Sequence, residues 1–197
     1  NGGTGSFQID VAISKFSPNG TNLIYSTYLG GSGNETPHSI VTDTNGDLYV
    51  LGATSSANFP LTGSPFDASF NGGLPISENS LSFDAGADIY IARLNPTGTQ
   101  LLAATYLGGS GTDGINTGSL HYNYGDQFRG EIIVSQNSVY ISSVTTSQNF
   151  PTQTPSQANN AGGQDAVVVK LNKSLSQLAW STYFGGIGDE TGNGIQL

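Results

Sequence analysis

The sequence predicts an all-β protein made of four-stranded antiparallel blades, of the kind that surround the axis of a β-propeller. Three observations support this prediction. Asp10, Asp88 and Asp165 each open an apolar strand, and they lie 78 and 77 residues apart. Short β-rich segments alternate with Gly-, Asn- and Ser-rich turns. No window shows the 3.6-residue apolar period of a helix.

Four strands are expected in the first repeat. The first, 10–16, is rich in β-branched residues and ends at the turn "PNG". The second, 23–29, ends at the glycines of "GGSG". The third, 39–43, leads into "TNGD", whose Asn-Gly pair is typical of a hairpin, and the fourth, 48–54, ends at "SSANFP".

The same pattern returns twice, and the repeats are expected at 1–87, 88–164 and, in part, 165–197. Tyr28, Tyr106 and Tyr183 keep the spacing of the aspartates and are expected to pack between blades. The motif "NFP" recurs after 91 residues, which indicates insertions at about 61–87 and 112–130. About two and a half repeats suggest part of a larger propeller, although an open repeat array is an alternative.

Composition excludes several classes of function. The 197 residues include only five Lys and Arg against fourteen Asp and Glu, which give a net charge of −9. Nucleic acids and anionic membranes are held mainly by basic residues, so neither is an expected partner. The chain has no Cys, and no apolar run is long enough to cross a bilayer.

The glycine-rich run could also be read as a phosphate-binding loop. Such a loop needs a following helix whose N–H groups face the phosphate, and it usually carries a Lys. Here strand residues follow "GGSGNET", no Lys is present, and the run occurs once in every repeat. We therefore interpret it as a turn of the scaffold.

These motifs resemble those of the bacterial SBBP repeat family, named for a seven-bladed β-propeller. The resemblance rests on "IYSTYLGGSG", "GDLYVLGATSSANFP", "ARLNPTG", "ATYLGGSG", "VKLNKS" and "WSTYFGGIG", and it spans the chain outside the two insertions. It implies a propeller fold in extracellular or surface proteins of bacteria. It implies no catalytic residues.

Positions shared by the repeats should build the scaffold. Lys15, Arg93 and Lys170 share one position, and we expect them to pair with acids of the same or a neighbouring blade. Positions that are not shared are free to specialise. The second insertion combines aromatic, acidic and basic residues, which is typical of a binding surface for sugar or protein: His121, Tyr122, Tyr124, Asp126, Phe128 and Arg129. The alternative is a loop that covers its own blade.

Acidic residues in the glycine-rich loops could bind Ca²⁺ through oxygen atoms, with Asp113, Asp189 and Glu190 as the candidates. Their spacing fits no EF-hand loop, and turn capping explains them equally well. No cofactor other than Ca²⁺ is expected.

We therefore expect a non-catalytic extracellular or cell-surface module that serves as a scaffold, adhesion or interaction domain. Its partners would be other blades or domains of the same parent protein, and a glycan or protein ligand. Two alternatives stay open: a lectin-like propeller that uses the aromatic insertion, and part of a propeller enzyme acting on polysaccharide.

Overall fold

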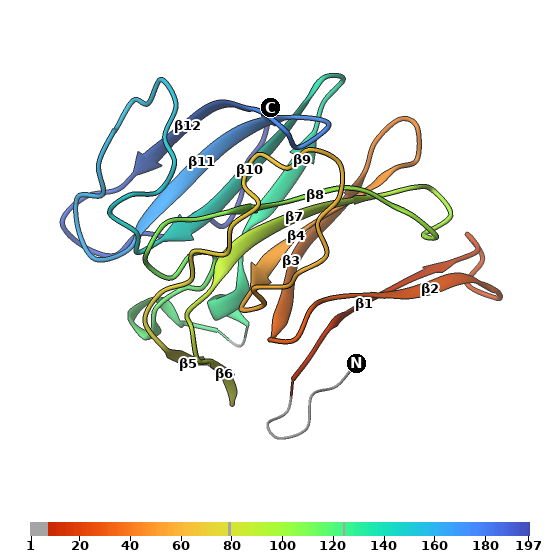
Figure 1. Cartoon of the computed structure of the whole chain (residues 1–197), viewed down its shortest axis with the longest axis horizontal. Coiled ribbons are helices and arrows are strands. Elements are labelled where there is room, and N and C mark those ends of the chain that lie inside the picture. Colours follow the sequence, from red (N-terminus) through yellow and green to blue (C-terminus); the bar gives the residue numbers. More distant parts are fainter. Residues whose placement is uncertain (1–7, 79, 124) are drawn as a thin grey trace.

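A computed structural model describes residues 8–78, 80–123 and 125–197, and it confirms an all-β protein of antiparallel four-stranded sheets (Figure 1). The strands are β1 (Val11–Phe16), β2 (Leu23–Leu29), β3 (Glu35–Thr42), β4 (Leu48–Thr54), β5 (Ile76–Glu78), β6 (Leu81–Phe83), β7 (Asp88–Leu94), β8 (Leu101–Leu107), β9 (Glu131–Val134), β10 (Ser138–Thr145), β11 (Asp165–Asn172) and β12 (Leu178–Phe184). Two single 3₁₀ turns, η1 (Gly118–Leu120) and η2 (Asp126–Phe128), lie in the second insertion. None of the helical segments described here is long and apolar enough to span a membrane.

The sheets do not coincide with the sequence repeats. One four-stranded sheet has the order β3-β4-β7-β8, and the other has the order β9-β10-β11-β12. Each sheet therefore takes two strands from one repeat and two from the next, whereas we expected the four strands of one repeat to lie together. Strands β1 and β2 form a separate two-stranded sheet.

Apolar side chains fill the space between neighbouring sheets. One cluster joins the two four-stranded sheets through residues such as Leu51, Ile91, Ile141 and Val169. A second cluster joins the β1–β2 hairpin to the first of these sheets, with Val11 and Ile13 against it. Because β3 and β9 are the first strands of their sheets and lie beside each other, the sheets are arranged side by side like propeller blades (Figure 1).

The third strand of the repeat is longer than the sequence indicates. Strand β3 begins at Glu35 instead of Ser39, and its register shifts between Pro37 and Ser39. In the second repeat, Asp113 forms an isolated bridge to Thr145, and β9 resumes only at Glu131. The second insertion therefore interrupts the third strand of the second repeat, at the place where the register of β3 shifts in the first repeat. In the third repeat, residues 185–197 form no strand.

The turns between the first two strands of each repeat need a left-handed residue. Gly20 and Gly98 have φ of 71° and 67° at equivalent places. Leu175 occupies the third of these places with φ of 56°, an unusual conformation for a residue with a side chain. Its side chain is buried in the cluster between the sheets, which compensates for the backbone strain.

Candidate functional site

Two acidic residues converge on the first glycine of each "GG" turn. In the second repeat, Asp113 Oδ2 and Asp88 Oδ1 lie 2.6 and 2.8 Å from the point where a Cβ of Gly108 would stand. The same arrangement places Asp10 and Glu35 at Gly30, and Asp165 and Glu190 at Gly185. Any side chain at this glycine would collide with both carboxyl groups. The glycine that recurs at this place in each repeat therefore has a structural cause: a carboxyl pair occupies the space of a side chain.

Burial makes ionisation of these groups unfavourable. Loss of solvent raises the pKa of Asp113 to about 8, and the nearby charge of Asp88 adds to this shift, although hydrogen bonds from Thr145, Gly109 and Ser147 oppose it. Burial likewise raises the pKa of Asp88 to about 7 against the hydrogen bonds of Asn71 and Gly72. One or both carboxyl groups of this pair therefore carry a proton near neutral pH.

Hydroxyl groups from the end of the fourth strand hold the acid that follows the turn. Thr54 and Ser56 donate to Glu35 Oε1, and Thr145 and Ser147 donate to Asp113. These bonds join the glycine turn to the residues just before "NFP". The turn and the strand end therefore form one rigid unit in both repeats.

A tyrosine of the following repeat forms hydrogen bonds with the segment that follows the fourth strand. The hydroxyl of Tyr106 donates to Ser56 O (2.7 Å) and accepts from Phe59 N–H (3.0 Å). Tyr183 repeats this arrangement with Ser147 O (2.9 Å) and Phe150 N–H (2.8 Å). Tyr28, expected to pack in the same way, is instead 77% exposed among the described residues.

The shared basic position behaves differently in each repeat. Arg93 bonds Asp47 through Nε (3.0 Å) and lies over the Tyr49 ring, 5.6 Å from its centroid. Lys170 lies over the Tyr140 ring, 5.3 Å from its centroid, where we expected a pair with an acid. Lys15 donates to Pro96 O at 3.4 Å. Ring stacking is thus the feature shared by the second and third repeats.

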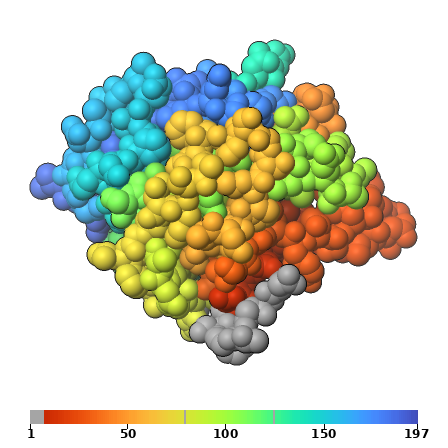
Figure 2. Space-filling model, in the orientation of Figure 1, coloured from red at the N-terminus to blue at the C-terminus, as the bar shows by residue number. Residues whose placement is uncertain are grey.

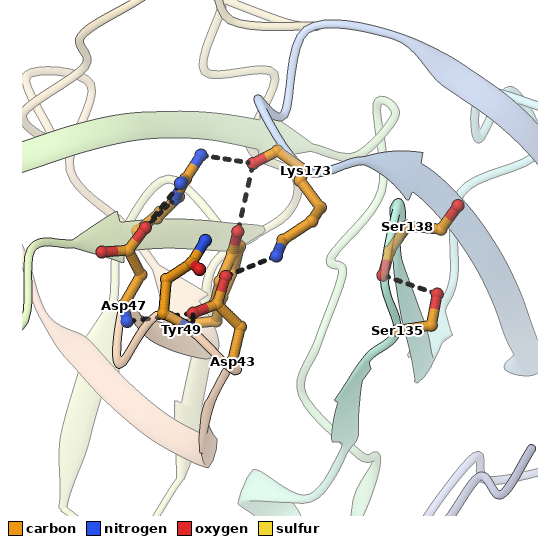
Figure 3. A network of polar contacts seen from close by, with 8 residues as sticks. Asp43, Asp47, Tyr49, Ser135, Ser138 and Lys173 are labelled. Carbon is orange, nitrogen blue, oxygen red and sulfur yellow. Dashed lines mark hydrogen bonds and ion pairs between the residues drawn. The ribbon is translucent and has the colours of Figure 1, made fainter.

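A polar network beside Arg93 ties the two large sheets together (Figure 3). The carbonyl of Lys173 accepts from Arg93 Nη1 (3.3 Å) and from the Tyr49 hydroxyl (3.4 Å). The Lys173 ammonium forms an ion pair with Asp43, and the pKa of Asp43 is lowered because that hydrogen bond and backbone N–H groups outweigh its desolvation. The β3–β4 turn is thereby joined to the β11–β12 turn. Nearby, Ser135 donates to Ser138 O within the second sheet (Figure 3).

The first insertion starts later than the sequence indicates. Asp67 N–H donates to Thr105 Oγ1 (2.9 Å), as Gln157 N–H does to Thr182 Oγ1 (2.8 Å) in the next repeat. The segment up to Gly72 is therefore part of the repeat, and the extra residues include the β5–β6 hairpin. Figure 2 shows the amber and yellow segment, which follows β4 in the first repeat, spread across the centre of this face.

The second insertion uses most of its polar groups internally. The carboxylate of Asp126 accepts from the backbone N–H of Tyr122 (3.0 Å) and of Asn123, and it pairs with Arg129 Nε (2.9 Å). These contacts lower the pKa of Asp126, with the backbone hydrogen bonds contributing more than the charge of Arg129. Of the residues predicted to bind, Tyr122 is 82% exposed and the Arg129 side chain is about half-exposed. Tyr124 lies outside the described residues.

The two insertions meet, although they belong to different repeats. His121 Nδ1 lies 3.6 Å from Glu78 Oε2, and Phe128 packs against Phe83 with ring centroids 6.1 Å apart. A separate apolar cluster lies between them, formed by Ala53, Phe83, Ala87 and Ile115 with Ile76, Leu81 and Phe128. We call the β5–β6 hairpin and residues 114–130 the insertion platform. The sequence offered no signal for this contact, because neither insertion has a repeat counterpart.

A polar pocket of about 520 Å³ lies where the first insertion meets the "GGSG" turn. Its lining is rich in hydroxyl, amide and carboxyl groups, with one aromatic ring: Ser32, Asn34, Ser55, Ser82, Asp84 and Phe70. A smaller hollow lies at the equivalent turn of the second repeat, between Leu74, Ser110 and Thr146. Sequence reasoning did not identify these residues, because serine and asparagine are abundant throughout the chain.

The three calcium candidates are not brought together. Asp113 is enclosed by hydroxyl and N–H donors, and Glu190 Oε2 accepts from Gly186 N–H (2.7 Å). Asp189 accepts from Gln164 N–H (3.0 Å) and Ser119 Oγ (2.7 Å), which links the second insertion to the third repeat. Within the part of the chain that the structure describes, no group of three or more His, Asp or Glu side chains is arranged to hold a metal ion.

Comparison with known families supports the repeat assignment. Residues 24–60 match the SBBP family model, described as a beta-propeller repeat. The match runs from β2 through the glycine turn to "NFP", and it includes the first two of the motifs on which the resemblance of the sequence is based. No curated protein matches the chain.

Proposed function

The chain carries an SBBP β-propeller repeat, and from this premise we propose that it is a non-catalytic, extracellular interaction module. The insertion platform would contact the partner, while the repeated strands act as scaffold. One observation carries this proposal: insertions from two consecutive repeats pack together around one apolar cluster, which also contains Ala53 of β4. Such a pre-organised surface loses little conformational entropy when it binds.

The exposed groups of the platform suit recognition better than chemistry. Tyr122 offers an exposed aromatic ring, and the Arg129 side chain of the same insertion is about half-exposed. Aromatic residues and Arg are enriched among residues that dominate binding energy. Hydrogen bonds within the insertion, and from Ser119 to Asp189 outside it, fix the loop that presents these groups. Extracellular location is proposed from the low content of charged residues and the net charge of −9.

A glycan is the second candidate ligand, and the polar pocket at the "GGSG" turn favours it. Ser32 and Asp84 line this pocket together with the Phe70 ring, while the Asn34 amide is held by Ile9 N–H and the Ser82 carbonyl. Sugars are commonly bound by such polar groups together with an aromatic face. If a glycan binds in this pocket, the first insertion provides more of the contacts with it than the aromatic residues of the second insertion do.

Binding measurements on the whole chain test both candidates. The chain would be presented to bacterial surface polysaccharides and to purified surface proteins, and compared with Tyr122→Ala/Arg129→Ala and with Asp84→Asn. A partner of the platform should lose tenfold or more in affinity with the double variant, and a glycan in the pocket should respond to Asp84→Asn. The control is Ile187→Ala, an exposed residue outside both insertions. Release of new reducing ends from a polysaccharide would contradict a non-catalytic role.

A further inference from the structure

Tyr28 is the exception among three equivalent tyrosines. Tyr106 and Tyr183 are each 1% exposed, whereas Tyr28 is 77% exposed. Phe16 shows the same contrast: it is 56% exposed, while the equivalent Leu94 and Leu171 are buried. The outer part of the β1–β2 hairpin thus presents large apolar groups that the other two repeats keep covered.

The internal repetition identifies what covers these positions elsewhere. Tyr106 is covered by the end of β4 and the "SANFP" segment that follows it, through Ser56 and Phe59. Tyr183 is covered by the end of β10 and "SQNFP", through Ser147 and Phe150. In both cases the covering segment belongs to the repeat before the tyrosine.

The edge of β1 lacks the corresponding strand. Strand β7 pairs with β4 on one side and β8 on the other, and β11 pairs with β10 and β12. Strand β1 pairs with β2 alone among the residues that the structure describes. An unpaired strand edge is a template for adding another strand, because its N–H and C=O groups are free to bond.

We propose that the β1–β2 hairpin is a docking site for the third and fourth strands of another SBBP-type repeat, ending in Ser-x-Asn-Phe-Pro. The tyrosine hydroxyl of Tyr28 would then donate to the Ser carbonyl and accept from the Phe N–H, as in the other two repeats. This site is distinct from the insertion platform and does not depend on the function proposed for that surface.

The register of the other repeats adds a second requirement for the partner. Tyr49 lies opposite Arg93, and Tyr140 lies opposite Lys170, with the cation over the ring in both pairs. Lys15 is the equivalent cation of β1. The docking strand therefore places a tyrosine opposite Lys15, and it runs antiparallel to β1.

A second copy of this chain does not supply the segment in its folded form. Both edges of β4 are paired, with β3 and β7, and both edges of β10 are paired, with β9 and β11. The occupant is therefore a repeat segment other than those of residues 8–197, either in the same polypeptide or in a separate one.

Binding in trans is the first test. A fluorescent peptide with the sequence of residues 35–60 is titrated into the whole chain and followed by anisotropy. Saturable binding is expected, and Tyr28→Phe should weaken it about three- to tenfold, the effect of one hydrogen bond. Ile187→Ala changes an exposed residue outside the hairpin and both insertions, and it should leave the affinity unchanged. A peptide with Phe59→Ala should bind more weakly than the parent peptide.

A covalent version keeps the proposal testable if the free peptide aggregates. A copy of residues 131–164 replaces residues 1–9, so that its connection enters Asp10 as it normally enters Asp165. Nitration of tyrosines by tetranitromethane should then fall at Tyr28 and stay unchanged at Tyr122, and the Tm should rise. Equal reactivity of Tyr28 with and without the added segment would overturn the proposal. Protection of Tyr28 through concentration-dependent self-association of the unextended chain would overturn it as well, because the occupant would then be a second copy.

Discussion

Asp88 and Asp113 direct their carboxyl oxygens into the one space that a side chain on Gly108 would need. The two acids lie 25 residues apart in sequence, and the pairs Asp10–Glu35 and Asp165–Glu190 have the same separation. Because both groups are buried, the stability of the fold depends on whether they are protonated, and therefore on pH.

We predict that the free energy of unfolding decreases between about pH 4 and pH 8. The folded pKa values of Asp88 and Asp113, about 7 and about 8, lie above their unfolded value of 3.8. The folded state therefore binds more protons in this range, and its advantage is lost as the pH rises through the folded pKa values. Urea denaturation at pH 5 and pH 8.5 measures the change.

Asp113→Asn should flatten this decrease, because an amide does not ionise. The exposed Asp84, changed to Asn, is the matched control and should keep the parental slope. Equal slopes for the parent and Asp113→Asn would show that this carboxyl group does not carry the pH dependence.

Gly108→Ala should destabilise the fold by about 2 kcal/mol or more, the usual cost of forcing atoms into a filled site. The new Cβ would lie 2.6 Å from Asp113 Oδ2 and 2.8 Å from Asp88 Oδ1. Gly118→Ala serves as control, since no atom lies within 4 Å of its Cβ position. Thermal denaturation of the two variants compares them directly, and a similar Tm for both would be inconsistent with the carboxyl pair.

Tyr183→Phe should cost about 1–3 kcal/mol, because the Phe150 N–H loses its buried acceptor and the Ser147 carbonyl its donor. Tyr122→Phe changes the same group at an exposed place and should cost almost nothing. Urea denaturation of both variants gives the difference, and equal midpoints would argue against a stabilising role for the tyrosine hydroxyl.

Leu175→Gly separates backbone strain from burial. Glycine would relieve about 1–2 kcal/mol of left-handed strain, whereas loss of the buried Leu side chain costs about 2–5 kcal/mol. We expect net destabilisation. The glycines at the equivalent positions, Gly20 and Gly98, would by themselves suggest that glycine is the better residue here. An increase in Tm for Leu175→Gly would mean that the strain outweighs the packing.

The sequence was sufficient to predict β2 and β4 closely because their signals are local, whereas the start of β3 and the β5–β6 hairpin were not predicted. Turn glycines, the Asn45–Gly46 hairpin and β-branched runs defined β2 and β4 to the residue. The grouping of strands into sheets depends on contacts between repeats, and a repeat period does not reveal its own starting point. For the same reason the contact between Glu78 and His121 was not predictable.

The carboxyl pairs could have been found from sequence alone. Each repeat has an acid 25 residues after the strand-opening Asp, at Glu35, Asp113 and Glu190. Their spacing is kept in all three repeats, because the first insertion lies outside this interval and the second begins only at its end. Their burial could not be inferred, since acidic residues in a glycine-rich loop are usually exposed to solvent.

Each four-stranded sheet combines strands of two consecutive repeats, and this arrangement has a mechanical consequence. If the chain is divided between Ala87 and Asp88, the border of two sequence repeats, β4 and β7 fall into different fragments. Each fragment then holds only half of that sheet. A break between β8 and β9 leaves both four-stranded sheets whole. Under tension, one repeat therefore cannot be pulled out alone: removing its four strands opens the sheets on both sides, so the load is shared along the array.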